Sequence, residues 1–187
     1  MPGIGPRQAR RIVQFLLRSS PRYVTNLSSS IAAVQKHVNQ CVRCFKFDDV
    51  NSAKLCPLCA DASRDDEIVM VVEKDVDVDG IESSNIYRGR YLVLGALIPL
   101  GVKRKSAVSA RVADLKRTIK NSPELKEVVL AFATTPEGDY TANELKKTIA
   151  EENSAINVSM LGRGLSLGAE IEYADQETLR SAFFGRH

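Results

Sequence analysis

The sequence predicts an α/β fold: a parallel sheet with covering helices, preceded by a small α-helical N-terminal part and a four-cysteine segment. From Glu67 onward, short runs rich in β-branched residues alternate with runs of helical periodicity. This alternation is typical of a parallel sheet with crossover helices. Before residue 41 the pattern is helical and basic, and all four cysteines lie between the two parts. The 187 residues suffice for one domain or two small ones.

The sequence pattern of the N-terminal part predicts two helices. Pro6 suits a first helical position because it has no amide proton, and this helix is expected to run to about Leu17. Its apolar stripe consists of Ala9, Ile12, Val13, Leu16 and Leu17. A second helix is expected from Asn26 or Ser28 to about Val38. Its expected inner face consists of Leu27, Ile31, Ala32 and Val34.

The remaining elements are expected after the cysteines. Strands are predicted at residues 68–72, 91–93, 128–132 and 156–160. Helices are predicted at about residues 106–120, 140–151 and 176–184, and Asp175 is a candidate N-cap for the last one. The boundary between the basic part and the α/β part is expected near residues 60–66.

Charge is distributed unevenly along the chain. The net charge is only +3, yet residues 1 to 47 contain eight basic residues and no acidic ones, so the remainder has a net charge of −5. The basic residues are Arg7, Arg10, Arg11, Arg18, Arg22, Lys36, Arg43 and Lys46. Such a block is typical of phosphate-backbone binding, with acidic proteins or lipid surfaces as alternatives. The chain shows no long apolar run and no signal peptide, which predicts a cytoplasmic protein.

The four cysteines form two Cys-x-x-Cys pairs, Cys41 with Cys44 and Cys56 with Cys59, separated by eleven residues. Two such turns brought together close a tetrahedral coordination sphere, which is the arrangement of structural zinc. No ligand position stays open for catalysis, and the binding energy would serve folding. The alternatives are two disulfides or a redox-active dithiol, which a cytoplasmic location disfavours.

A glycine-rich turn precedes the first predicted helix. Gly3 and Gly5 permit backbone conformations that other residues resist, and bare amides beside a helix N-terminus attract phosphate. The turn resembles the second half of a helix-hairpin-helix motif, and the alternative is an ordinary Gly/Pro-rich turn. Arg7, Arg10 and Arg11 are the candidate DNA contacts. The helix that normally precedes this hairpin is absent, which leaves open a shortened chain, a start assigned too late, or a partner subunit that covers the apolar face.

Acidic residues follow two of the predicted strands. Glu73 ends one strand, and Glu137-Gly138-Asp139 lies between a later strand and the expected start of a helix. Ligands of open α/β sheets collect at such strand ends. A lone Glu followed by an acid-x-acid pair is the arrangement of the toprim domain, in which carboxylates hold magnesium. The glycine is expected to let the turn bring both acids toward one ion. The alternative is loop carboxylates that cap helices.

These features, in this order, resemble the RecR family of bacterial recombination mediators. Three further stretches strengthen the match: residues 87–95 (YRGRYLVLG), residues 163–165 (RGL) and residues 168–175 (GAEIEYAD). The resemblance covers nearly the whole chain. It implies a partial helix-hairpin-helix region at 1–40, a zinc finger at 41–66, a toprim domain at 67–161 and a C-terminal tail and helix at 162–187.

The resemblance also implies a function without catalysis. Members of the family bind single- and double-stranded DNA, form homo-oligomeric rings, and act with RecO, and in many lineages RecF, to help RecA replace single-strand binding protein. By position, Arg7 and Arg11 correspond to DNA contacts of the family. The cluster of Glu73, Glu137 and Asp139 corresponds to an acidic surface for partner docking or magnesium.

The sequence departs from the family pattern in several places. The missing first helix affects ring assembly, the eleven-residue loop lengthens the tip of the finger, and Leu92 and Asp139 replace a usual His and Glu. The basic loop at Lys103–Lys105 is an additional DNA contact or, more simply, a solvated loop. Two other functions stay open. One is a magnesium-dependent toprim nuclease or primase-like enzyme, although no nucleophile is evident; the other is a zinc-ribbon module that binds only protein.

Overall fold

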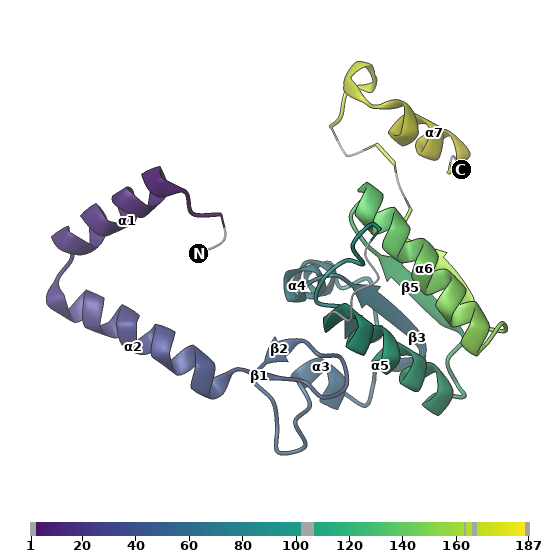
Figure 1. Cartoon of the computed structure of the whole chain (residues 1–187), viewed down its shortest axis with the longest axis horizontal. Helices are drawn as coiled ribbons and strands as arrows, with labels where there is room; N and C mark the ends of the chain where they lie inside the picture. Colours follow the sequence, from purple (N-terminus) through teal and green to yellow (C-terminus); the bar gives the residue numbers. More distant parts are fainter. Residues whose placement is uncertain (1–2, 102–106, 163, 166–167, 186–187) are drawn as a thin grey trace.

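The computed structural model describes residues 3–101, 107–162, 164–165 and 168–185, shown in Figure 1. A basic helical arm leads into a small four-cysteine finger, a parallel α/β domain and a C-terminal segment. The elements in chain order are α1 (Pro6–Arg18), α2 (Pro21–His37), β1 (Asn39–Gln40), β2 (Phe47–Asp48), α3 (Pro57–Ala60), β3 (Asp65–Val72), α4 (Asp75–Ser83), β4 (Gly89–Val93), α5 (Ala107–Asn121), β5 (Glu127–Ala131), α6 (Pro136–Glu152), β6 (Asn157–Met160), the 3-10 turn η1 (Ile171–Tyr173) and α7 (Gln176–Phe184).

The α/β domain is built on a four-stranded sheet with the order β4-β3-β5-β6, in which all neighbouring strands are parallel. Side chains alternate between its two faces, as the pleat of a strand requires. Val69 and Val71 pack with α5 and α6 on one face, and Met70 and Val72 pack with α4 and the cysteines on the other. Both faces are therefore covered, which is typical of a parallel sheet.

The four predicted strands and the last helix are confirmed, with shifts of a few residues at the strand ends. Two helices begin earlier than predicted. Helix α2 begins at Pro21 after the N-cap Ser20, whose hydroxyl accepts from the Tyr23 amide at 3.3 Å. Helix α6 begins at Pro136 after the N-cap Thr135. In both cases a capping hydroxyl followed by Pro at the first helical position is the start signal that the prediction missed.

Among the described residues, no surface of this chain buries the apolar stripes of the N-terminal arm. Along α1 and α2 the apolar stripes stay exposed, with exposed fractions of 52% for Val13, 57% for Ile31 and 56% for Val34. Figure 1 shows both helices lying apart from the sheet. The ring of Phe15 meets that of Tyr23 edge-on, with centroids 5.6 Å apart, where α1 turns into α2. The prediction that α2 packs inward was wrong, because no described part of the chain packs against its apolar residues.

The C-terminal segment also lies mostly on the surface. Exposed aromatic side chains occur in η1 and α7, including Tyr173 at 80% and Phe184 at 75%. Asp175 caps α7 as predicted, accepting from the Thr178 amide at 2.9 Å. In the described part of the chain, none of the helices has the length and apolar character needed to cross a membrane.

Candidate functional site

The four cysteines lie together in the finger, which comprises β1, β2, α3 and their connecting loops. Cys41 and Cys44 flank a turn after β1, and Cys56 and Cys59 lie at the start of α3. All four side chains are buried, with exposed fractions of 0 to 6%, and their sulfur atoms lie within 4.8 Å of one another. The Sγ atoms of Cys44 and Cys56 are 3.6 Å apart. That separation is too long for a disulfide but close to the roughly 3.8 Å between thiolates on one tetrahedral zinc.

Main-chain hydrogen bonds hold both knuckles of the finger. The amides of Cys41 and Phe45 donate to the carbonyls of Lys46 and Cys41 at 2.8 and 3.0 Å. In the second knuckle, the Cys59 amide donates to the Cys56 carbonyl at 3.0 Å. The Cys56 amide donates to the Cys41 sulfur at 3.4 Å, which joins the two knuckles. Amide donors favour thiolate sulfur, so the backbone is arranged for a metal-bound state.

The protonation of this cluster also favours a cation. Hydrogen bonding with Cys56 and Cys59, followed by burial, raises the pKa of the Cys44 thiol. Hydrogen bonds from Cys44 and Cys59 lower the pKa of Cys56 to about 2. Without a positive ion, four adjacent buried thiols cannot all ionise. A divalent metal removes this conflict, so the residues present fit structural zinc.

The finger is fixed to the α/β domain on both sides. Arg90 in β4 donates from Nη1 to the carbonyls of Leu58 at 3.1 Å and Asp61 at 2.8 Å. On the other side, buried Lys46 pairs with Asp48 at 2.7 Å and with Asp79 of α4 at 3.3 Å. Hydrogen bonding to Asp48 raises the Lys46 pKa against the opposing effect of burial. These contacts make the finger an integral part of the domain.

The basic residues predicted to contact DNA lie on the exposed arm. Arg7, Arg10 and Arg11 are exposed on α1, and Arg10, Arg11 and Arg18 line a shallow groove together with Phe15. Gly3 has φ +75°, a conformation that favours glycine, and the Gly5 carbonyl accepts from the Ala9 amide at 2.9 Å. No acidic residue occupies the first turn of α1. The geometry therefore leaves this helix start open to an anion.

The three acidic residues of the predicted magnesium site lie at the carboxyl edge of the sheet but not in one cluster. Glu73 follows β3 and pairs with Lys74 at 3.1 Å. Glu137 and Asp139 lie in the first turn of α6, not before it as predicted, and residues two apart in a helix point to different sides. Among the described residues, the cysteines are the one group of three or more candidate ligands close enough to share an ion.

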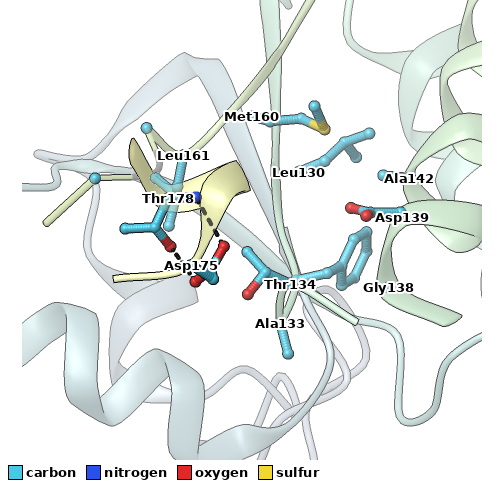
Figure 2. Close-up of a pocket in the computed structure, with 13 residues that line it drawn as sticks. Leu130, Ala133, Thr134, Gly138, Asp139, Ala142, Met160, Leu161, Asp175 and Thr178 are labelled. Atoms are coloured by element: carbon cyan, nitrogen blue, oxygen red, sulfur yellow. Dashed lines mark hydrogen bonds between the residues drawn. The ribbon is translucent and has the colours of Figure 1, made fainter. Parts of the chain in front are cut away.

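Gly138 has a different role from the predicted one. A Cβ atom at this position would lie 2.0 Å from the Ala133 carbonyl oxygen, so glycine permits the close approach of the first turn of α6 to the loop that joins it to β5. Asp139 lines a pocket of about 590 Å³ between α6, the ends of β5 and β6, and the start of α7. Figure 2 shows Asp139 and Asp175 on opposite sides of this pocket.

Comparison with known proteins places this architecture in a family. A family model described as "Toprim domain" matches residues 67–161, and one described as "RecR, C-terminal" matches residues 164–187. The Recombination protein RecR of Chloroflexus aurantiacus is 38% identical over 188 residues, covering 100% of this chain and 88% of the relative. Those of Dehalococcoides mccartyi and Bdellovibrio bacteriovorus are 36% and 33% identical, with 100% of this chain and 88% and 91% of the relatives covered. The chain belongs to the RecR family.

Within this RecR-family chain, sequence reasoning missed the residues that connect the finger to the sheet. Arg90 and Lys46 were noted only as part of a family-like stretch and of the basic block. The sequence contained a signal for Arg90: an arginine within a buried strand such as residues 89–93 is rarely unpaired, so a partner for it could have been expected. Helix α4 was missed too, although Asp77 accepts from the Lys74 amide at 2.8 Å as in a capping box. The basic loop at Lys103–Lys105 lies outside the described residues.

Proposed function

We propose that this protein is a non-catalytic DNA-binding mediator of recombinational repair, which binds the backbones of single- and double-stranded DNA through α1. The observation on which this rests is the exposed arginine surface of Arg7, Arg10 and Arg11 beside a glycine turn. Its relatives are named recombination proteins. Contacts to phosphates give binding that depends on salt but little on sequence.

The arm differs in charge from the rest of the molecule. On α5, Lys116 and Lys120 pair with Glu152 at 2.8 and 3.0 Å, and Arg117 pairs with Asp114 at 2.9 Å. In the part of the chain that the structure describes, the arginines of α1 have no such acidic partner. Unpaired arginines can release counterions from DNA without first breaking an ion pair, so the arm is the favoured DNA-binding surface.

The partners follow from the family and from the uncovered surfaces. A second copy of the chain would cover the apolar stripes of α1 and α2 and so build a homo-oligomeric ring. The acidic edge around Glu73, Glu137 and Asp139 is proposed to dock RecO, and RecF where it is present, in loading RecA onto single-stranded DNA. Zinc at the four cysteines would be structural. Magnesium would bind one or two of the carboxylates, as that ion commonly does in proteins.

We assign each activity to a segment. Residues 1–40 would bind DNA, residues 41–66 would form the zinc finger, residues 67–161 would form the toprim domain, and residues 162–187 would form the C-terminal tail. The protein would act in the cytoplasm, at the nucleoid, where its DNA substrate lies.

Fluorescence anisotropy with labelled single- and double-stranded DNA over a salt series tests this proposal. Reversal of two charges in Arg7→Glu/Arg11→Glu should abolish measurable binding and leave zinc content and circular dichroism unchanged. The matched control, Arg88→Glu/Lys146→Glu, changes the net charge equally at two exposed residues outside the arm. An equal loss of DNA affinity in both variants would indicate a general effect of net charge. Unchanged affinity of Arg7→Glu/Arg11→Glu would exclude α1 as the DNA contact.

The toprim match supports one alternative, a magnesium-dependent enzyme that cuts or copies DNA. Magnesium-dependent nicking that disappears in Glu73→Gln would establish it and exclude a purely mediating role. The residues offer little for such chemistry, because His37 lies on the exposed arm, away from the acidic edge. We therefore expect no turnover with either supercoiled or single-stranded DNA. Light scattering on the same protein reports whether it assembles as an oligomer.

A further inference from the structure

The finger covers an edge of the sheet. Strand β4 is an outer strand of the order β4-β3-β5-β6, and an outer strand presents unpaired main-chain groups on one side. The Leu94 amide donates to Val72 in β3, whereas the Val93 amide points the other way and donates to the Cys44 carbonyl at 2.8 Å. Since main-chain groups alternate along a parallel strand, those of Tyr91 also face outward, toward the finger.

Contacts with this edge lie at both ends of β4, one made by the finger and the other by Arg64, which lies between the finger and β3. Cys44 covers its carboxyl end through the bond to Val93. At its start, Nη1 of Arg64, which directly precedes β3, donates to the Gly89 carbonyl at 3.0 Å. Between them the buried guanidinium of Arg90, 7% exposed, reaches outward to carbonyls of the α3 region. The edge is therefore covered by the finger rather than by another strand.

This cover depends on the cysteine cluster. Cys44 supplies both a sulfur for the metal and the carbonyl for Val93, and the carbonyls held by Arg90 belong to Leu58 and Asp61, which flank Cys59. The regular structure of the finger consists of two two-residue strands and a four-residue helix. Elements this short do not fold without a staple, so the conformation that reaches β4 requires the ion.

We propose that the zinc finger is a metal-dependent cap on the β4 edge, and that loss of the metal frees this edge to pair with the β4 edge of a second copy. The inference goes beyond DNA binding, since it concerns a surface remote from α1. Strand β4 reads GRYLV and all five residues are buried. A freed strand of this composition favours β-pairing, and two identical edges can pair about a twofold axis.

Hydrogen exchange on the full-length, reduced protein tests the cap. At a protein concentration low enough to keep the chains apart, removal of the metal by a chelator should increase exchange of the Val93 amide at least about tenfold. The Leu94 amide, which bonds to Val72 in β3, and residues 127–131 of β5 should stay nearly unchanged. One equivalent of zinc should restore protection. The variant Cys44→Ser should show the same exposed edge without a chelator, and added zinc should not restore it.

Light scattering on the same preparations at higher protein concentrations tests the pairing. The metal-free protein should gain a concentration-dependent species of twice the starting mass, which zinc reverses. Protection of the Val93 amide that persists without metal in the dilute sample would overturn the cap. Equal loss of protection in β4 and β5 would also overturn it, because the metal would then support the whole domain. An exposed edge with unchanged mass would overturn the pairing.

Discussion

The guanidinium of Arg90 and the carboxylate of Asp66 form an ion pair, with 2.8 Å between Nε and Oδ1. Arg43, in the first cysteine knuckle, reaches the same oxygen at 2.6 Å. Asp66 therefore lies between a buried arginine of the edge strand and an exposed arginine of the finger. Because Arg90 also donates to the carbonyls of the finger, one side chain connects strand, carboxylate and metal-binding loop.

Replacement of Arg90 tests this connection. Arg90→Met keeps most of the volume but leaves the carbonyls of Leu58 and Asp61 without their donor, and Asp66 without its buried partner. We expect a loss of about 2 to 4 kcal/mol in the free energy of unfolding, measured by urea denaturation. The control Arg88→Met, at an exposed position in the same segment, should change it by less than about 0.5 kcal/mol. Equal effects would show that Arg90 does not hold the finger.

The same ion pair predicts a pH dependence. Hydrogen bonding to Arg90 lowers the Asp66 pKa below its usual value, so folding favours the ionised carboxylate. This stability is fully present above the unfolded pKa of about 3.9 and is lost as pH falls through the lower folded pKa. Asp66→Asn should therefore unfold more easily than the wild type at pH 5 to 7, and the difference should shrink below about pH 4. The side chain is 41% exposed, so the difference should stay near 1 kcal/mol.

Denaturation curves at matched pH measure that difference, and Asp65→Asn is the control. Asp65 lies beside Asp66 but is exposed, and no arginine forms an ion pair with it in the described part of the chain. A difference between wild type and Asp66→Asn that grows as the pH falls would contradict the prediction, because protonation would then strengthen the contact.

Replacing two helical glycines by alanine distinguishes a steric requirement for glycine from the general effect of alanine on helix stability. Gly138→Ala would place a methyl group 2.0 Å from the Ala133 carbonyl oxygen, so the first turn of α6 must move away from the loop that joins it to β5. We expect it to cost about 2 kcal/mol or more. Gly80→Ala in α4 meets nothing within 4 Å and should be neutral or stabilise by up to about 1 kcal/mol. Thermal unfolding of both variants gives the comparison, and a tolerated Gly138→Ala would show that α6 can shift freely.

The inner strand β3 was predictable because it contains a short apolar run, Val69 to Val72, that both faces of the sheet bury. Helix α4 was not predicted because Asp and Val alternate from Asp75 to Asp79 with a period of two, which hides its helical character. Only Val78 of this stretch is fully buried. A tertiary contact also forms at the start of α4, where the Phe47 amide donates to the Asp75 carboxylate at 2.8 Å.

The grouping of the four cysteines was predictable from spacing alone, because two Cys-x-x-Cys turns have few other uses. The placement of the finger was not. Arg90 contacts main-chain carbonyls of residues 29 and 32 positions away in the sequence. Every residue has such a carbonyl, so the residue types at those positions do not reveal the contact. Likewise, the acids at 137 and 139 were expected before a helix because the start signal at Thr135 and Pro136 was not used.

The four-cysteine cluster of the finger predicts a definite metal content. Four sulfur atoms within 4.8 Å of one another should bind one zinc per chain, and X-ray absorption should show four sulfur ligands at about 2.3 Å. Cobalt in place of zinc should give the spectrum of a tetrahedral site. Cys56→Ser should lose the metal and destabilise the finger, whereas Val42→Ser, at an exposed position between the first two ligands, should retain it. A native protein without metal, whose mass shows the loss of hydrogen on formation of two disulfides, would contradict the site. The 3.6 Å between the sulfur atoms of Cys44 and Cys56 is too long for such a covalent bond.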